Sequence, residues 1–341
     1  MVAETYKKEN DKKNIEKTEK ILYSLPSFIR DYFVSRRSNT STKTRLAYAY
    51  DLRGFFSWLK ETTPEFLNKE IKEITIEEFG EIKARDIEDY IFFLQSKPEN
   101  TNANVSIARK LACLSSVFGY FSTHDIIPKN PCDAVNPPKI HDIEIITLTP
   151  VEIGTLLNVI EFGSNQFSEK QESYLKKTRF RDLTIVILML TTGIRVSECV
   201  SLDISSIRLD ECLMSVIRKG GNVASVALSD EAIEILTDYL NWRKSVNTTE
   251  SALFLSLQGK RMCIQSIEDM LKKYVKAAGI DKPITPHKLR KTFGTQLYRE
   301  TGDIYLVASS LGHSSPTTTA RSYAKQSTDN LLNARNKVKL K

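Results

Sequence analysis

The apolar positions in the first third of the chain recur at intervals of three and four residues, the spacing of helices with one buried face. One such helix is predicted over residues 42–60, where the apolar positions are Leu46, Tyr50, Leu52, Phe55, Phe56 and Leu59. Two further helices are predicted over residues 84–95 and 102–123, and the acidic segment 62–82 is interpreted as an elaborated connection. This part of the chain therefore predicts a small helical bundle.

Charge and proline mark the limits of this bundle. Residues 1–20 are highly charged and lack an apolar period, which predicts a disordered or frayed tail. Residues 128–148 have no sustained period and contain the four prolines Pro128, Pro131, Pro137 and Pro138, a composition typical of a linker. We therefore expect an N-terminal domain at 21–127 and a second domain at 149–341.

The second domain is predicted to be mainly helical with a small antiparallel sheet. Thr149 and Pro150 suit the start of one helix, and a strongly apolar helix further along is predicted to end at Gly193. Between them, the polar segment 162–178 favours a surface loop or a helical insertion. Alternating apolar residues predict three antiparallel strands, at 204–209, 212–217 and 223–228. From Asp230 onward the pattern is helical again.

The composition is that of a globular protein with a sizeable core. Of the 341 residues, 41% are hydrophobic and 27% are charged, which excludes a chain that is disordered throughout. The net charge of +7 permits an anionic partner without requiring one. Charge alone therefore raises the expectation of a nucleic-acid partner only modestly.

The cysteines and the hydropathy indicate where the protein works. The five cysteines have no CxxC pair and no histidine at metal-ligand spacing; they are Cys113, Cys132, Cys199, Cys212 and Cys263. This pattern predicts reduced thiols and no metal site. The charged N-terminus has no signal-peptide pattern, and the longest apolar run, 183–190, is far shorter than the roughly 20 residues that cross a bilayer. We expect a cytoplasmic protein with no membrane partner.

Two motifs of the second domain place a cation beside a turn. Arg195 follows the predicted helix end, and Glu198 lies three residues further on, where it can hold the guanidinium in place. The alternative is a surface ion pair that contributes little. Lys219 lies at a predicted hairpin tip, in the sequence 218–222. Most such lysines are merely solvated, although a flexible hairpin can bring an ammonium group to a phosphate ester.

Two later motifs add histidines and a tyrosine. In the sequence 285–290, His287 and Arg290 lie three residues apart on one face of a helix that Thr285 and Pro286 can begin. The positive end of this helix biases His287 toward its neutral form, although the residue can equally be an ordinary part of a helix start. In the sequence 311–323, a Leu-Gly-His-Ser-Ser motif precedes Tyr323. Two of the four histidines thus fall inside these short motifs.

The order of these motifs resembles the tyrosine recombinase (phage integrase) family, and most of all its Xer-type members. The motifs are Gly-Ile-Arg-Val-Ser-Glu, a lysine hairpin, His-Lys-Leu-Arg, and Leu-Gly-His-Ser-Ser followed by tyrosine. In the N-terminal domain, the positions that match the core-binding helix of that family are Thr44, Tyr48, Asp51, Leu52 and Phe55. Residues 106–111, 130–131 and 138–139 match its later helix and linker. The resemblance extends from about residue 25 to the end.

The resemblance implies a helical, SAM-like core-binding domain followed by a mixed α+β catalytic domain. It also implies roles for the motif residues. Arg195 and Arg290 would grip the non-bridging oxygens of a scissile phosphate, with Glu198 holding Arg195. Lys219 would protonate the leaving 5′ oxygen. The remaining roles are a proton relay, a hydrogen-bond donor to the phosphate and the nucleophile, for His287, His313 and Tyr323.

The same resemblance implies the partners and the course of the reaction. Attack by Tyr323 would give a 3′-phosphotyrosine, and strand exchange would pass through a Holliday junction without ATP, metal or cofactor. The partner would be double-stranded DNA with a short inverted-repeat site, bound by a homotetramer, with or without a second recombinase or an accessory protein. The tail after Tyr323 would dock on a neighbouring subunit or pack in cis. The candidate DNA contacts are Lys43, Thr44, Arg45, Arg109 and Lys110, unless they form only a solvated basic face.

Some features depart from the Xer pattern. Tyr323 follows His313 by ten residues, where nine is usual, and the extra glycine at 220–221 loosens the lysine hairpin. The segments 62–82 and 162–178 resemble insertions, which argues against a housekeeping Xer protein. Two other functions stay open: a type IB topoisomerase, and a DNA-binding protein that has lost catalysis. The intact catalytic set disfavours the second.

Overall fold

The structure is a computed structural model that describes residues 2–96, 103–139, 145–218, 221–312 and 319. The chain forms two compact units, one of residues 6–143 and one of residues 144–341 together with 1–5. The described residues are mainly helical, with one small antiparallel sheet in the second unit. No helix among them is long and apolar enough to cross a membrane. The predicted fold class, mainly α with a small antiparallel sheet, is confirmed.

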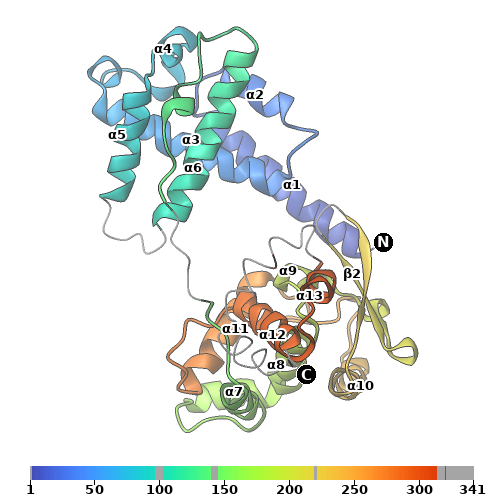
Figure 1. Ribbon diagram of the computed structural model, residues 1–341. Helices are drawn as coiled ribbons and strands as arrows, with labels where there is room; N and C mark the ends of the chain where they lie inside the picture. The colour runs from blue at the N-terminus through green and yellow to red at the C-terminus, as the bar shows by residue number, and fades with distance from the viewer. Residues whose placement is uncertain (1, 97–102, 140–144, 219–220, 313–318, 320–341) are drawn as a thin grey trace, which may run out of the picture. The chain divides into compact units, whose positions relative to one another are not determined.

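The first unit is a bundle of helices. The α-helices are α1 (Val2–Leu22), α2 (Ile29–Ser35), α3 (Thr42–Thr62), α4 (Ile76–Gly80), α5 (Ala84–Gln95) and α6 (Ala103–Thr123). Short 3-10 turns occur at Pro64–Phe66, Ile71–Glu73 and Pro131–Ala134. Helix α6 packs against both α3 and α5 (Figure 1).

Helix α1 corrects one prediction, because we expected residues 1–20 to be disordered or frayed. Most of its length is solvated, but the last turn buries Ile21 and Leu22 in the core of the first unit. Further back, the hydroxyl of Thr42 donates a hydrogen bond to Asp11. The lysines and glutamates that dominate this segment are good helix formers. One buried turn and a few polar contacts therefore hold a helix that has no apolar stripe along its length.

Aromatic side chains form much of the core of the first unit. The rings of Phe79 and Phe118 stack with centroids 4.1 Å apart and planes within 4° of parallel. Phe79 lies in the acidic segment 62–82, so that segment supplies part of the core rather than only a connection. Cys132 and Val135 are also buried there, so the start of the predicted linker packs on the bundle.

The second unit surrounds the long helix α8. Its α-helices are α7 (Pro150–Phe162), α8 (Glu169–Thr192), α9 (Val196–Ser201), α10 (Asp230–Lys244), α11 (Ile264–Ala277), α12 (Pro286–Thr301) and α13 (Ile304–Leu311). The strands are β1 (Ile207–Arg208), β2 (Leu213–Ile217) and β3 (Val223–Ala227), and 3-10 turns occur at Ile204–Ser206 and Leu209–Glu211. Helix α8 packs against α7, α10 and α12 (Figure 1).

Helix α8 begins earlier than the sequence pattern indicated. We interpreted 162–178 as a loop or an inserted helix, and the structure places residues from Glu169 onward in α8 itself. Ser168 starts the helix through a capping box. Its hydroxyl accepts a hydrogen bond from the amide of Gln171 at 3.3 Å, and its own amide donates to the side chain of Gln171 at 2.9 Å. The first turns of α8 are polar because they are largely solvated.

The sheet is antiparallel in the order β1-β2-β3. The first strand is shorter than predicted, because Ile204–Ser206 forms a 3-10 turn and only Ile207 and Arg208 pair with β2. Strands β2 and β3 pair along their full length, and Ile217 faces Val223 at the end of the ladder. This register places the predicted lysine hairpin directly beyond that last pair.

Candidate active site

The end of α8 delivers Arg195. Gly193 ends the helix with a φ of 62°, a left-handed conformation that favours glycine. Space also requires glycine here, since a Cβ atom at residue 193 would collide with the side chains of Phe293 and Leu311. The chain then turns, and Arg195 becomes the N-cap residue of α9. The predicted helix end therefore determines where this arginine lies.

Glu198 holds Arg195 with both carboxylate oxygens. One oxygen lies 2.7 Å from Nη1 of Arg195, and the other accepts the amide N–H of the same residue at 2.9 Å. Glu198 is almost completely buried, whereas 37% of the Arg195 side chain is exposed. The pair therefore differs from a solvated surface ion pair. It fixes the arginine and leaves part of its side chain accessible to a bound anion.

Arg290 joins two loops of the site. It lies on α12, is 3% exposed, and donates from Nη1 to the carbonyl oxygen of Gly193 at 2.5 Å. Its Nη2 donates to the carbonyl oxygen of Leu311, at the end of α13. Gly193 precedes Arg195 by two residues, and Leu311 precedes His313 by two. One guanidinium therefore fixes the start of both segments.

His287 lies in the first turn of α12 and is exposed. Pro286 occupies the first helical position, and Thr285 is the N-cap residue, but its side chain makes no capping hydrogen bond. Partial desolvation, followed by the charges of Lys291 and Arg290, lowers the pKa of His287. Arg195 lowers it further, so both arginines act on this imidazole. Desolvation and the neighbouring cations therefore bias His287 toward its neutral form.

The lysine hairpin is described up to Arg218 and again from Gly221. The amide of Arg218 donates to the carbonyl of Asn222 at 2.8 Å, and the amide of Gly221 donates to the carbonyl of Arg218 at 3.0 Å. The side chain of Arg218 reaches the end of α13, where Nη2 lies 3.2 Å from the carbonyl oxygen of Ser310. Lys219, His313 and Tyr323 lie outside the described residues.

Four of the five predicted DNA-contact residues of the first unit have partners within the protein. Arg109 and Lys110 of α6 both pair with Asp51 of α3, and Nζ of Lys110 lies 3.1 Å from Oδ1 of the aspartate. Asp51 is 3% exposed, and 47% of the Arg109 side chain is exposed. The sequence pattern singled out Asp51 but not this pairing.

The remaining predicted contacts lie at the start of α3. Arg45 donates from Nη1 to the carbonyl oxygens of Arg37 and Thr40, each at 2.8 Å. The Thr44 hydroxyl lies 2.8 Å from that of Ser41, the N-cap residue of α3. Lys43 is exposed. Arg45 and Thr44 therefore support the start of the helix, whatever else they contact.

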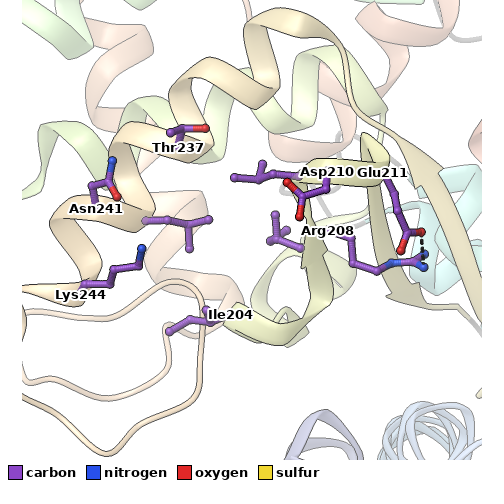
Figure 2. A pocket seen from close by; sticks show the side chains of 10 residues that line it. Ile204, Arg208, Asp210, Glu211, Thr237, Asn241 and Lys244 are labelled. Carbon is purple, nitrogen blue, oxygen red and sulfur yellow. Dashed lines mark hydrogen bonds and ion pairs between the residues drawn. The ribbon is translucent and has the colours of Figure 1, made fainter.

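A pocket of about 510 Å³ lies elsewhere in the second unit, between the segment around β1 and helix α10 (Figure 2). Asp210 and the ion pair of Arg208 with Glu211 border one side, and Asn241 and Lys244 border the other. None of the predicted catalytic residues lines it. In the part of the chain that the structure describes, no cluster of histidine, cysteine, aspartate or glutamate could hold a metal ion.

Known proteins resemble this chain in both sequence and fold. Residues 161–330 match the Phage integrase family. The chain is 32% identical over 299 residues to the tyrosine recombinase XerC of Caldanaerobacter subterraneus subsp. tengcongensis, covering 85% of this chain and 79% of the relative. It is 31% identical over 331 residues to the tyrosine recombinase XerS of Streptococcus agalactiae, covering 88% of this chain and 92% of the relative.

Two solved structures share the fold over most of the chain. The integrase of transposon Tn1549, in complex with circular intermediate DNA, has a TM-score of 0.67 and 21% identity and covers 89% of this chain and 97% of its own. The XerH recombinase, in a post-cleavage complex with its palindromic difH substrate, has a TM-score of 0.64 and 19% identity, with coverage of 87% and 80%. At these identities the likeness concerns the fold.

Fold, motif order and relatives together define a tyrosine site-specific recombinase, an enzyme that breaks and rejoins DNA. The chain belongs to the phage integrase family, and its curated relatives are Xer tyrosine recombinases. The predicted family is thereby confirmed.

Proposed function

We propose that this recombinase cuts double-stranded DNA by attack of Tyr323 on a scissile phosphate. The observation that supports this most is the convergence of Arg195, His287 and Arg290 at the ends of helices α8, α9 and α12. Both arginines lower the pKa of His287, and Arg290 binds the segment that leads to Arg195. Two fixed cations and a neutral imidazole are a suitable environment for a phosphate in transit between two alcohols.

In this proposal the arginines bind the non-bridging oxygens of the phosphate. Guanidinium suits this role because it is permanently charged and has two parallel donors. Tyrosine, with a pKa near 10, is about three units from ionisation at pH 7, a deficit of roughly 4 kcal/mol. Nearby cations lower this deficit, and a neutral His287 can relay the phenolic proton. His313 would donate a further hydrogen bond to the phosphate.

The proposed step forms one P–O bond and breaks another, so it needs no external energy source. The oxygen of Tyr323 bonds to phosphorus, the bond from phosphorus to the 5′ oxygen breaks, and the ammonium of Lys219 gives a proton to that oxygen. The phosphotyrosine keeps the ester energy, so the 5′ hydroxyl of another strand can reverse the step. Two such exchanges form and then resolve a Holliday junction.

We infer that the DNA partner is a duplex with a short inverted-repeat site. The support is by analogy: the XerH structure contains a palindromic substrate, and the Tn1549 integrase contains circular intermediate DNA. A homotetramer would bring two sites together, with the tail after Tyr323 docked on a neighbouring subunit. Arg109 and Lys43 would add phosphate contacts from the first unit, giving affinity that falls with salt.

A type IB topoisomerase would use the same chemistry and form the same phosphotyrosine. The close relatives favour the recombinase, since both are named tyrosine recombinases. The two functions separate on plasmids. A recombinase exchanges strands between two copies of a site and yields a deletion or an inversion, whereas a topoisomerase only changes the linking number.

Covalent capture on DNA tests the proposal directly. The protein is mixed with sheared genomic DNA from its own source, denatured with SDS, and the protein-linked fragments are sequenced. Tyr323→Phe should abolish the adducts, and Tyr305→Phe should not, because Tyr305 is a solvated tyrosine of α13 that is 71% exposed. Wild-type adducts should carry a 3′ linkage and map to a short inverted repeat.

Two other outcomes would contradict the proposal. Adducts that persist in Tyr323→Phe would assign the nucleophile to another residue. Specific binding without any adduct would favour a DNA-binding protein that has lost catalysis.

A further inference from the structure

Arg218 makes a contact that the proposed mechanism does not use. It is the last described residue of the hairpin before Lys219, and its half-buried side chain extends from the end of β2 to the C-terminal end of α13. Nη2 donates to the carbonyl oxygen of Ser310 at 3.2 Å. The guanidinium also lies against Gly312, where an added Cβ atom would overlap Nη1 of Arg218.

The end of α13 is well suited to hold this arginine. The last carbonyl groups of a helix have no partner within the helix, and together they form its negative end. Arg218 binds the carbonyl of Ser310, and Arg290 binds the next carbonyl, that of Leu311. Two guanidinium groups from different elements thus meet at consecutive residues of one helix end. Gly312, with a φ of 61°, leaves the space for the first of them.

The arginine is held there at a cost. Among the described residues, its Nε is buried and has no hydrogen-bond partner. A buried N–H without an acceptor is unfavourable, so the contacts that the rest of the guanidinium makes must offset that loss.

We propose that Arg218 is a positioning residue that fastens the β2–β3 hairpin to the end of α13. Lys219 is its immediate neighbour in the chain, and Gly312 immediately precedes His313. The contact would therefore set Lys219 in a fixed relation to the segment of His313. This inference rests on the proposed role of Lys219 as the proton donor to the leaving oxygen.

The chemical reason for such a fastening lies in the composition of the hairpin. Lys219 is followed by two glycines, which give the backbone the greatest freedom. A general acid acts only within hydrogen-bond reach of the atom that it protonates, and small displacements cost rate. Anchoring the residue next to the lysine reduces the space that the ammonium group explores.

A sulfur substitution in the DNA tests this inference apart from general stability. The probe is the duplex recovered by covalent capture, made once with oxygen and once with sulfur at the bridging 5′ position of the scissile phosphate. A thiolate leaves without taking up a proton, so a defect in proton donation disappears with sulfur, whereas a defect in folding or binding persists. Single-turnover cleavage of both duplexes is measured for each variant.

We expect Arg218→Ala to cleave the oxygen duplex about 10- to 100-fold more slowly, less than the full contribution of a general acid. With the sulfur duplex its rate should return to within about threefold of wild type. Arg218→Lys, which keeps a cation able to reach the Ser310 carbonyl, should recover part of the loss on oxygen. The matched control is Arg208→Ala: Arg208 belongs to the same sheet, also has a buried unpaired Nε, and pairs with Glu211. It should match wild type on both duplexes.

Failure of the proposed role of Lys219 and failure of the positioning role of Arg218 give different results. If Lys219→Ala is slow on both duplexes, the proposed role of Lys219 is wrong. If sulfur restores Lys219→Ala but not Arg218→Ala, or if Arg218→Ala cleaves the oxygen duplex at the wild-type rate, the positioning role of Arg218 is wrong.

Discussion

Two sets of cations, one in each unit, are held in different ways. In the first unit, the carboxylate of Asp51 pairs with both Arg109 and Lys110, so one buried negative charge offsets part of two positive ones. In the second unit, Arg290 and Arg218 donate to backbone carbonyls at helix ends. A carboxylate orients a cation and also cancels its charge. A carbonyl orients it and leaves the charge in place.

This difference would suit the tasks that the proposed function assigns to the two units. Coulomb attraction between a phosphate and a cation is strongest where the cation is fixed, partly desolvated and not already neutralised. Arg195 lies between the two cases, since Glu198 binds it but 37% of its side chain stays exposed. The catalytic unit therefore carries fixed positive charge where a phosphate is expected. In the proposed function, the moderated charge of Arg109 and Lys110 would suit weaker contacts with the DNA backbone.

Removing Arg290, which donates to two backbone carbonyls, should have the largest effect on the cleavage rate. Arg290→Gln should lower the single-turnover cleavage rate on the order of 100- to 1,000-fold, the usual effect of losing one donor to a developing charge. It should also destabilise the protein by about 1–3 kcal/mol, because the carbonyls of Gly193 and Leu311 lose their donor. Quench-flow cleavage and urea unfolding measure the two effects.

The control for this prediction separates charge from geometry. Arg290→Lys keeps the charge but cannot donate to both carbonyls from one planar group. If the lysine variant cleaves as fast as wild type, the link between the two loops is unimportant for catalysis. If Arg290→Gln itself cleaves normally, the proposed site is wrong.

Local structure was largely predictable from the sequence. The predicted helix at 84–95 coincides with α5, and the predicted end of α8 at Gly193 is confirmed by its left-handed conformation. Both depend on a helical period and a nearby end signal. Helix α1 was missed because its stability comes from Ile21 and Leu22 in its last turn, not from an apolar stripe.

The contacts within the site were not predictable from one sequence. The Arg290 guanidinium binds carbonyls that lie 97 and 21 residues away along the chain. Any residue has a carbonyl, so no side-chain pattern reports such a contact. The pairing of Arg195 with Glu198 could be predicted because it spans only three residues of a helix start.

Arg195 is the intermediate case, because Glu198 binds it and part of its side chain stays exposed. Loosening this contact should lower the cleavage rate less than Arg290→Gln does. Glu198→Gln keeps the shape of the side chain but removes the charge that binds the Arg195 guanidinium. We expect cleavage to fall about 10-fold, because a fixed arginine would become a mobile one. The amide oxygen can still accept the Arg195 N–H, so helix α9 should persist and circular dichroism should be unchanged. A variant as active as wild type would show that Glu198 does not position Arg195.

Removing the carboxylate from the first unit should act in the opposite direction on DNA binding. Asp51→Asn frees Arg109 and Lys110 from their shared partner, so affinity for the duplex should rise at low salt. The slope of log K against log salt concentration should steepen by about one for each cation that gains a phosphate. Filter binding between low and physiological salt measures the slope.

The same variant should also lose stability, by about 1–3 kcal/mol, the usual effect of losing hydrogen bonds to a charged group. The exposure of Arg109, 47%, keeps the loss below that of a fully buried ion pair. Urea unfolding checks this value. An unchanged salt slope in a correctly folded Asp51→Asn protein would mean that these cations belong to a solvated face and do not contact DNA.

The smallest expected effect concerns the pH dependence of the second unit. Desolvation and the surrounding cations lower the pKa of His287 below its usual value near 6.5, so the imidazole stays neutral in the folded protein as the pH falls through that value. The cleavage rate should therefore hold level through pH 6.5 and decline only at lower pH. The unfolded chain takes up the proton first, so this group's contribution to stability is fully present above pH 6.5 and is lost as the pH falls below it.

His287→Gln should abolish the decline of the cleavage rate at acidic pH, and Lys291→Gln should move that decline to higher pH. If the cleavage rate of the wild type declines with a midpoint at or above pH 6.5, desolvation and the neighbouring cations do not lower the pKa of His287.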